Sequence, residues 1–237
     1  MTASISISNS NSNDGVGDER TPLRYRAAMA WDTEGTRRRL KDAATAEFAE
    51  RGREGTTMSR IAARAGINKE RLYSYFGDKQ ALWDLVLAEQ LELLAAGVRA
   101  TGAGLDDVGE FAGATFDHHA DHPVLARLLQ WEGLDATGHV AGRPGRSRHY
   151  REKVERFAAA QRAGTIDDGL DPAHLVFALI ALAAWWHTVP QLASMVTGAE
   201  PGDPAERAAR RAFVVEAARR LAAPRRSPDE VPGPDRG

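Results

Sequence analysis

Residues 66–79 read GINKERLYSYFGDK, a pattern that predicts one short helix between two sharp turns. Gly66 can adopt the left-handed backbone conformation that ends a preceding helix, and Asn68 is a favourable N-cap for the next one. Leu72 and Phe76 lie one helical turn apart, so they share a buried face. The outer face is polar and can form hydrogen bonds, which suits a helix that enters a groove of DNA.

Two further helices are expected around this stretch. The first starts near residues 33–36 and ends at Gly52, and its apolar side chains recur at helical spacing, at Leu40, Ala43, Ala44 and Phe48. The second begins after Thr57, another favourable N-cap, and closes at Gly66. Two short helices joined by a tight, glycine-containing turn form a helix-turn-helix, in which the second helix reads the DNA.

A longer run of residues carries a family resemblance. Residues 56–69 (TTMSRIAARAGINK) and 72–82 (LYSYFGDKQAL) resemble the DNA-binding domain of the TetR family of transcriptional regulators. The resemblance covers roughly residues 36–82. This chain has Glu70 where the family usually has a small residue, and Asn68 and Arg71 where it often has Ser or Thr. These departures fall on the reading face, so they bear on which operator is bound.

The resemblance implies DNA contacts at nine positions: Thr57, Ser59, Asn68, Lys69, Glu70, Arg71, Tyr73, Tyr75 and Lys79. Glu70 and Arg71 are expected to read bases, since Arg pairs with guanine and Glu accepts a hydrogen bond from cytosine. The Lys and Tyr side chains are expected mainly to hold phosphates. Two alternatives stay open. Glu70 can form a local ion pair with a neighbouring basic residue, and the two tyrosines can pack on the domain core.

The charge of the chain is unevenly distributed. The whole sequence has 31 basic and 33 acidic residues, a formal net charge of −2. Residues 24–80 hold 13 Lys or Arg against 8 Asp or Glu, so a basic block is followed by an acidic remainder. This pattern fits local contact with phosphates. The absence of cysteine excludes disulfides, cysteine nucleophiles and thiolate metal sites.

The termini and the longest apolar run bear on localisation. The first twenty residues have neither a basic nor an apolar segment of a secretory signal. The apolar run at 175–186 is too short for a membrane span, which needs about 20 residues. We therefore expect a cytoplasmic protein without a membrane partner.

The rest of the chain predicts an all-α fold. Helices are expected after Asp78 and then at Asp107–Ala120, Pro123–Ala136, Ser147–Ala163, Pro172–Val196 and Pro204–Ala223. Pro190 should kink or split the fourth of these body helices. The predicted organisation is a disordered tail at 1–31, a three-helix DNA-binding domain at 32–80, a helical effector-binding and dimerisation domain at 81–223, and a disordered tail at 224–237.

The last two long helices are candidates for a homodimer interface, as the resemblance implies. Their apolar residues are Leu175, Val176, Leu179, Ile180, Leu182 and Ala183, and Phe213, Val214, Ala217, Ala218 and Leu221. Pairing them across two chains would build a four-helix bundle. The alternative is that both helices simply cover the core of a monomer.

Aromatic and histidine side chains of the body are candidates for an effector pocket: Phe116, His119, Trp131, Phe177, Trp185 and His187. Small-molecule pockets combine apolar walls with a few polar groups. His118 and His122 have the spacing of two metal ligands on one helix, but no third ligand follows at a convincing spacing. The sequence therefore predicts no metal site, no cofactor and no catalytic residue.

Together these features predict a transcriptional regulator. It would bind a double-stranded, pseudo-palindromic operator as a homodimer, act as a repressor, and be released by a small apolar or aromatic effector that the sequence does not identify. One alternative is a DNA-binding protein without an effector, which would lack a body cavity. Another is an enzyme with an accessory DNA-binding head, but no catalytic triad or glycine-rich phosphate loop supports it.

Overall fold

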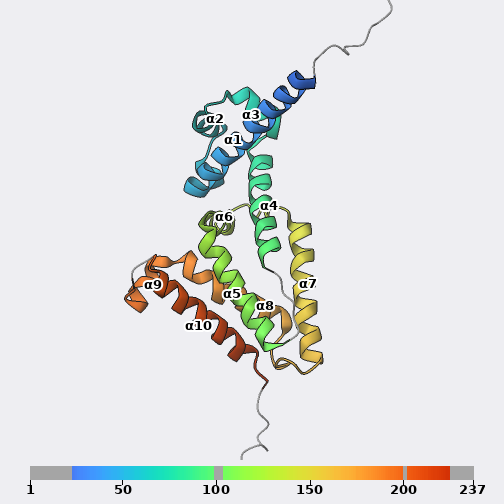
Figure 1. Cartoon of the computed structure of the whole chain (residues 1–237), viewed down its shortest axis with the longest axis vertical. Helices are drawn as coiled ribbons and strands as arrows, with labels where there is room; N and C mark the ends of the chain where they lie inside the picture. The colour runs from blue at the N-terminus through green and yellow to red at the C-terminus, as the bar shows by residue number, and fades with distance from the viewer. Residues whose placement is uncertain (1–22, 99–103, 200–201, 225–237) are drawn as a thin grey trace, which may run out of the picture.

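The computed structural model describes residues 23–98, 104–199 and 202–224 (Figure 1). Most of the two tails predicted to be disordered lies outside these ranges. The first helix, α1 (Leu23–Gly55), begins well before the start expected near residues 33–36. Residues 23–31 are therefore helical, contrary to the prediction of a disordered tail that extends to residue 31. Within the described residues the fold is all-α, as predicted.

The N-terminal part, called the head below, packs around one core. It contains α1, α2 (Met58–Ala65), α3 (Lys69–Phe76) and the first half of α4 (Lys79–Gly97). Its core brings together apolar side chains from all four helices, among them Leu40, Phe48, Ile61, Leu72, Leu82 and Trp83. The rings of Phe48 and Trp83 meet edge to face, with 5.2 Å between their centroids.

Side-chain caps set where the helices of the head begin. Thr57, Asn68 and Asp78 each accept a hydrogen bond from the backbone N–H three residues later, at 3.2, 2.9 and 2.8 Å. Gly66 ends α2 with a φ of 66°, the left-handed conformation expected of it. The predicted helix-turn-helix is thus confirmed in its boundaries and in its capping residues.

The C-terminal part, called the body below, consists of α5 (Leu105–Asp121), α6 (Pro123–Gly133), α7 (Arg143–Arg162), α8 (Pro172–Thr188), α9 (Pro190–Thr197) and α10 (Pro204–Ala222). Pro190 splits the predicted helix at 172–196 into α8 and α9, which are bent by 87°. The body core gathers around Phe111, Phe157, Leu179 and Val214.

Helices α5 and α10 approach each other closely because α5 has glycines at the contact. A Cβ atom on Gly109 or Gly113 would lie 3.1 or 2.9 Å from the side chain of Val215. The two helices lie side by side in the body (Figure 1). No single helix among the described residues is long and apolar enough to cross a membrane, although α8 and α9 together meet that test by length and composition alone.

Helix α4 joins the head to the body (Figure 1). Its first half contributes Leu82, Trp83, Val86 and Leu87 to the head core. Leu94, in its second half, packs against the cores of both parts. A tilt of α4 would therefore change the packing of the head and of the body together.

Candidate nucleic-acid interface and adjoining cavity

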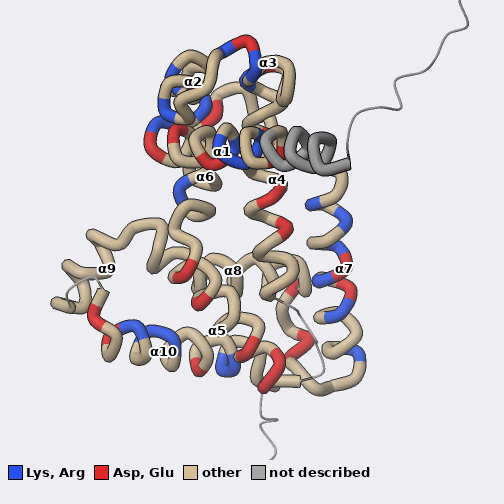
Figure 2. The backbone as a smooth tube through the Cα atoms, turned by 45° about the horizontal axis from the view of Figure 1, so that its top comes forward, with Lys and Arg blue, Asp and Glu red and all other residues tan. Residues whose placement is uncertain are grey.

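Helix α3 presents a polar face to solvent at one end of the molecule. Leu72 and Phe76 are buried as predicted, while Lys69, Glu70 and Arg71 are exposed. Lys and Arg positions are distributed across α1, α2 and α3 (Figure 2). This end of the chain combines an exposed helix with positive charge, the combination that contact with DNA needs.

Two cations of α3 lie over tyrosine rings. Lys69 Nζ lies 5.6 Å from the ring centroid of Tyr73, and the guanidinium carbon of Arg71 lies 5.8 Å from that of Tyr75. Arg71 Nη2 also donates to the Tyr75 hydroxyl at 3.5 Å. These contacts favour one arrangement of the two cationic side chains on the surface of α3. Among the described residues, Glu70 forms no ion pair, contrary to one of the alternatives considered for it.

The other predicted DNA contacts have different surroundings. Tyr73 is exposed, whereas Tyr75 is half-buried and packs against the head core. Thr57 and Ser59 are exposed at the start of α2. Lys79 is half-buried, and its Nζ donates to the backbone carbonyl of Thr56 at 3.2 Å. The ammonium group of Lys79 therefore has a structural contact within the head.

A buried carboxylate fixes α2 against α1. Glu47 is buried and accepts hydrogen bonds from Arg60 Nε and Arg64 Nη1, each at 3.0 Å. Burial by itself raises the pKa of Glu47, but the two arginines outweigh it and hold the pKa below its ordinary value. The buried charge is thus compensated, and α2 is held in a fixed orientation relative to α1.

The head meets the body where α6 crosses the end of α1. Trp131 Nε1 and Arg127 Nε of α6 both donate to the carbonyl of Ala49, at 3.2 and 3.0 Å. Gly52, three residues later, has a φ of 69° and interrupts the helical geometry of α1, in agreement with its predicted role as a helix end. The Trp131 ring lies directly against it.

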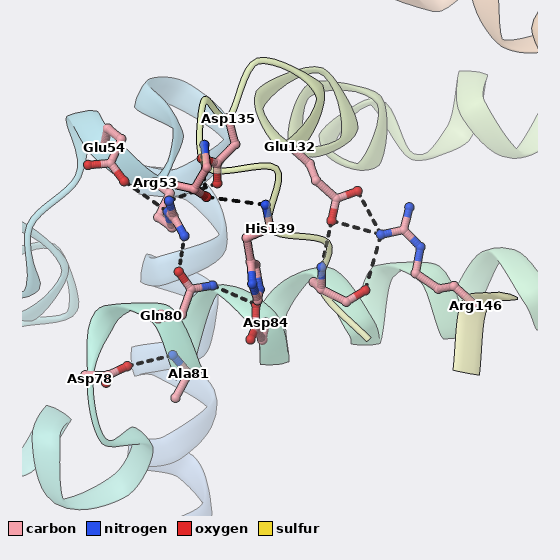
Figure 3. Close-up of polar contacts among 12 residues, drawn as sticks. Arg53, Glu54, Asp78, Gln80, Ala81, Asp84, Glu132, Asp135, His139 and Arg146 are labelled. Carbon is pink, nitrogen blue, oxygen red and sulfur yellow. Dashed lines mark hydrogen bonds and ion pairs between the residues drawn. The ribbon is translucent and has the colours of Figure 1, made fainter. Parts of the chain in front are cut away.

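A chain of polar contacts extends this junction (Figure 3). Arg53 Nη2 forms an ion pair with Asp135 at 2.9 Å, and both side chains are largely buried. Arg53 also donates to the Gln80 side chain. Gln80 in turn donates to Asp84 at 2.9 Å, and His139 Nε2 lies 2.8 Å from the same carboxylate. Residues from α1, α4 and the α6–α7 connection are thereby tied together.

The α6–α7 connection is also anchored to the start of α7. Glu132 Oε1 accepts from the backbone N–H of Ala141 at 3.0 Å, and its two oxygens lie 2.8 and 2.7 Å from Arg146 Nη1. Arg146 also donates to the carbonyl of Ala141. Figure 3 shows that this cluster lies beside the Asp84–His139 contact.

A cavity of about 480 Å³ lies between α4, α5, α7 and α8. Its walls include Leu91 and Leu94 of α4, Phe111 of α5, Arg146 and Lys153 of α7, and Ile180 of α8. The volume is within the range of small-molecule sites, and the apolar walls with a few polar groups match their usual composition. Arg146 belongs both to this wall and to the contacts of Figure 3, so the cavity adjoins the head–body junction.

Comparison with known proteins agrees with both parts of this architecture. Residues 40–86 match the profile of the bacterial regulatory proteins of the tetR family, and residues 107–220 match that of the tetracyclin repressor-like C-terminal domain. The HTH-type transcriptional repressor SCO4008 of Streptomyces coelicolor is 38% identical over 170 residues, which cover 71% of this chain and 87% of that protein. The chain belongs to the TetR family.

Other members are similar to it along most of the chain. The HTH-type transcriptional regulator RutR of Escherichia coli strain K12 is 28% identical over 170 residues, or 68% of this chain and 77% of that protein. The crystal structure of the transcriptional regulator SCO4942 of Streptomyces coelicolor is 31% identical, with a TM-score of 0.67 over 79% of this chain and 98% of that one. This TetR-family chain is therefore a DNA-binding transcriptional regulator.

The cavity of this TetR-family protein is lined by none of the six residues predicted for an effector pocket. Phe177 and Trp185 are 74% and 56% exposed, on the side of α8 opposite its buried residues. Trp131 is occupied by its contact with α1. Phe116, His119 and His187 pack against one another in a separate cluster. The prediction followed aromatic residue type, which does not show which face of a helix is turned inward.

The cavity wall was missed for a related reason. Lys153 and Arg146 are absent from the predicted pocket, because charged residues on a helix usually face solvent. One signal was available: Lys153 shares a helical stripe with Phe157 and Ala160, all three of which are buried.

The histidines of α5 do not assemble a metal site within the described residues, where no group of three or more potential ligands comes together. The rings of His118 and His122 stack at 4.1 Å, and His122 Nδ1 lies 3.0 Å from the carbonyl of His118.

The apolar residues of α8 and α10 divide between two faces. Six residues predicted for the dimer interface are instead buried within the protomer: Leu175, Val176, Leu179, Ala183, Val214 and Ala218. The outward face carries Phe177 and Trp185 of α8 and Phe213 and Leu221 of α10. Since α8 is apolar on all sides, its sequence did not show which side the protomer core would take.

Proposed function

We propose that this chain is a repressor that binds a pseudo-palindromic operator as a homodimer and leaves it when a small-molecule effector fills the cavity. The observation that carries this proposal is the path of α4. Its residues Trp83 and Leu87 lie in the head core, while Leu91 and Leu94 line the cavity. A ligand that binds more tightly to one tilt of α4 shifts the equilibrium between two positions of the head. The size of that shift is set by the difference in its affinity for the two arrangements.

In this proposal the head at residues 32–80 supplies the DNA contacts and residues 81–223 supply the switch and the dimer interface. Arg71 and Glu70 read bases, while Lys69 and Tyr73 hold phosphates. One head makes too few base contacts for strong specificity, so two heads must reach half-sites about one helical turn apart.

The outward faces of α8 and α10, with Phe177, Trp185, Phe213 and Leu221, support a homodimer. Four large apolar side chains exposed on two adjacent helices are a surface that soluble chains normally cover. A second copy of the same helices would complete a four-helix bundle.

The cavity favours this proposal over a DNA-binding protein without an effector, because that alternative predicted a body with no space for a small molecule. We assign the chain no enzymatic activity and place it in the cytoplasm, where its operator would be.

The test begins with selection of operator sequences from random DNA by the purified full-length protein. A pseudo-palindrome is expected. Arg71→Ala should then weaken binding to the selected operator by about 1–3 kcal/mol and relax the preference at one base position, because one base contact is lost.

Lys69→Ala is the matched comparison on the same helix. It should weaken binding to all sequences alike and lower the slope of affinity against salt concentration, because it removes a phosphate contact. Equal loss on every sequence for the Arg71 variant would show that Arg71 does not read bases. Selection of no sequence at all would contradict the proposed function.

A further inference from the structure

The α7 wall of the cavity differs in chemistry from the other three. Arg146, His149 and Lys153 all line it, and they follow one another at helical spacing on one face of α7. The facing walls, from α4, α5 and α8, are mainly apolar, with Leu91, Phe111 and Ile180. The cavity is therefore polarised, with basic groups on one side and hydrocarbon on the other.

Lys153 is the unusual member of this wall, because only 8% of it is exposed. Its Nζ lies 3.4 Å from the carbonyl oxygen of Val98 and 5.0 Å from the ring centroid of Phe111. No ion pair with a carboxylate is formed within the described ranges, and residues 99–103, RATGA, contain no acidic side chain. A buried ammonium group without an anion is costly, since burial removes its water.

No group near Lys153 compensates its positive charge. Burial lowers its pKa, and the positive charge of Arg156 lowers it further. Arg146 has its own counterion, since it lies 2.7 Å from Glu132. Glu92, the one acidic side chain in the cavity wall, is exposed on α4 and forms no ion pair with Lys153.

His149 adds a hydrogen-bonding group to the same face. Burial lowers its pKa first, and the nearby Lys153 lowers it further, so the imidazole is neutral near pH 7. A neutral imidazole can donate one hydrogen bond without adding charge. Lys153 and His149 together therefore offer one cationic and one neutral donor to a group inside the cavity.

We propose that the effector is a carboxylic acid with an apolar body. Its carboxylate is bound by Lys153, with His149 as a second donor, and its hydrocarbon part lies against Leu91, Phe111 and Ile180. This inference rests on the proposed function in taking the cavity as the effector site. The carboxylate of the ligand is the counterion that Lys153 lacks within the protein. Binding of the effector therefore offsets the free energy that burial of the Lys153 ammonium group costs.

The test uses octanoate, decanoate and dodecanoate against the matching alcohols, measured by titration calorimetry on the full chain. The wild type should bind an acid of this series about 10- to 100-fold more tightly than its alcohol, because a hydrogen bond to a charged group is lost in the alcohol. Lys153→Met keeps the shape of the side chain without its charge, and should bind acid and alcohol with similar affinity. Arg148→Met, which removes an exposed charge from the same helix, should keep the preference.

A second measurement separates binding from structural support. Unliganded Lys153→Met should melt at a higher temperature than the wild type, because an uncompensated buried charge is removed. A lower melting temperature with loss of alcohol binding would show that Lys153 is a structural residue. Equal binding of acid and alcohol by the wild type, or no binding of any acid, would also overturn the inference.

A third measurement, release of the selected operator when the acid is added, tests the ligand class and the effector role of the cavity separately. If the acid binds through Lys153 and frees the DNA, both hold. If it binds through Lys153 and the operator stays bound, the ligand class is supported and the effector role of the cavity is contradicted.

Discussion

Gly52 adopts a backbone conformation, and sits in a space, that a residue with a side chain would not fit. Its φ of 69° and ψ of 178° lie in a region that glycine adopts readily and other residues avoid. A Cβ atom at this position would lie 2.8 Å from two ring carbons of Trp131. The backbone of α1 and the indole of α6 therefore fit together only when residue 52 is glycine.

Gly52→Ala should lower the free energy of unfolding by about 1–3 kcal/mol, since it adds both backbone strain and a steric conflict with Trp131. Chemical denaturation of the purified variant measures this directly. Gly35→Ala is the control in the same helix, because a Cβ atom there meets nothing within 4 Å. That change should stabilise the protein by about 0.5–1 kcal/mol. If both variants lost stability equally, the contact with Trp131 would not be the cause.

At the scale of single elements, α5 stands out for the histidines it buries. His119 is 4% exposed, and its Nδ1 has no hydrogen-bond partner within the described part of the chain. Burial, and after it the positive charges that His187, His118 and His122 can carry, lower its pKa from 6.5 to about 4. The folded protein therefore holds His119 neutral well below the pH at which an unfolded histidine takes up a proton.

This difference makes the stability of the body depend on pH. A lowered pKa in the folded state means that stability is complete above about pH 6.5 and is lost as the pH falls toward about 4. We expect His119 to account for about 2 kcal/mol of loss between about pH 7 and pH 5. His119→Leu should flatten the dependence of the unfolding free energy on pH over that interval, whereas the exposed His174→Gln should leave it unchanged. An unchanged slope in the His119 variant would contradict the assignment.

The elements were largely predictable from sequence, and the cavity was not. Thr57, Asn68 and Asp78 act through backbone groups only three residues away, so their capping roles can be read locally. Pro190 splits its helix for an equally local reason. Lys153 is buried by Val98 and Phe111, which are distant in sequence, and on α7 only its helical stripe with Phe157 and Ala160 indicates this. The residues that line a cavity depend on how helices pack, which local patterns do not specify.

At the scale of the whole molecule, the head and the body are joined by two routes. One is the hydrophobic continuity of α4, and the other is the set of contacts from Arg53 through Gln80 to Asp84 and His139 (Figure 3). Both routes reach the neighbourhood of the cavity, since Arg146 and Leu91 line it. Neither route would set the distance between the two α3 helices of the proposed homodimer, which depends on how two bodies associate.

The outward faces of α8 and α10 make this association testable. Phe177 is 74% exposed and Phe213 is 56% exposed, although the Phe213 ring also meets that of Trp186, with 6.0 Å between their centroids. A stable dimer buries about 1,200–2,000 Å² in total, and large apolar side chains at its centre provide most of the affinity.

The double variant Phe177→Asp, Phe213→Asp should therefore be a folded monomer by light scattering and circular dichroism. Its affinity for the operator should fall by about 10²- to 10⁴-fold, because the two half-sites are no longer bound by one linked pair of heads. Leu134→Asp alters a side chain of the same 74% exposure at the end of α6 and should remain dimeric. A double variant that stays dimeric would place the interface on another face, and the spacing of the two α3 helices would then follow from that face instead.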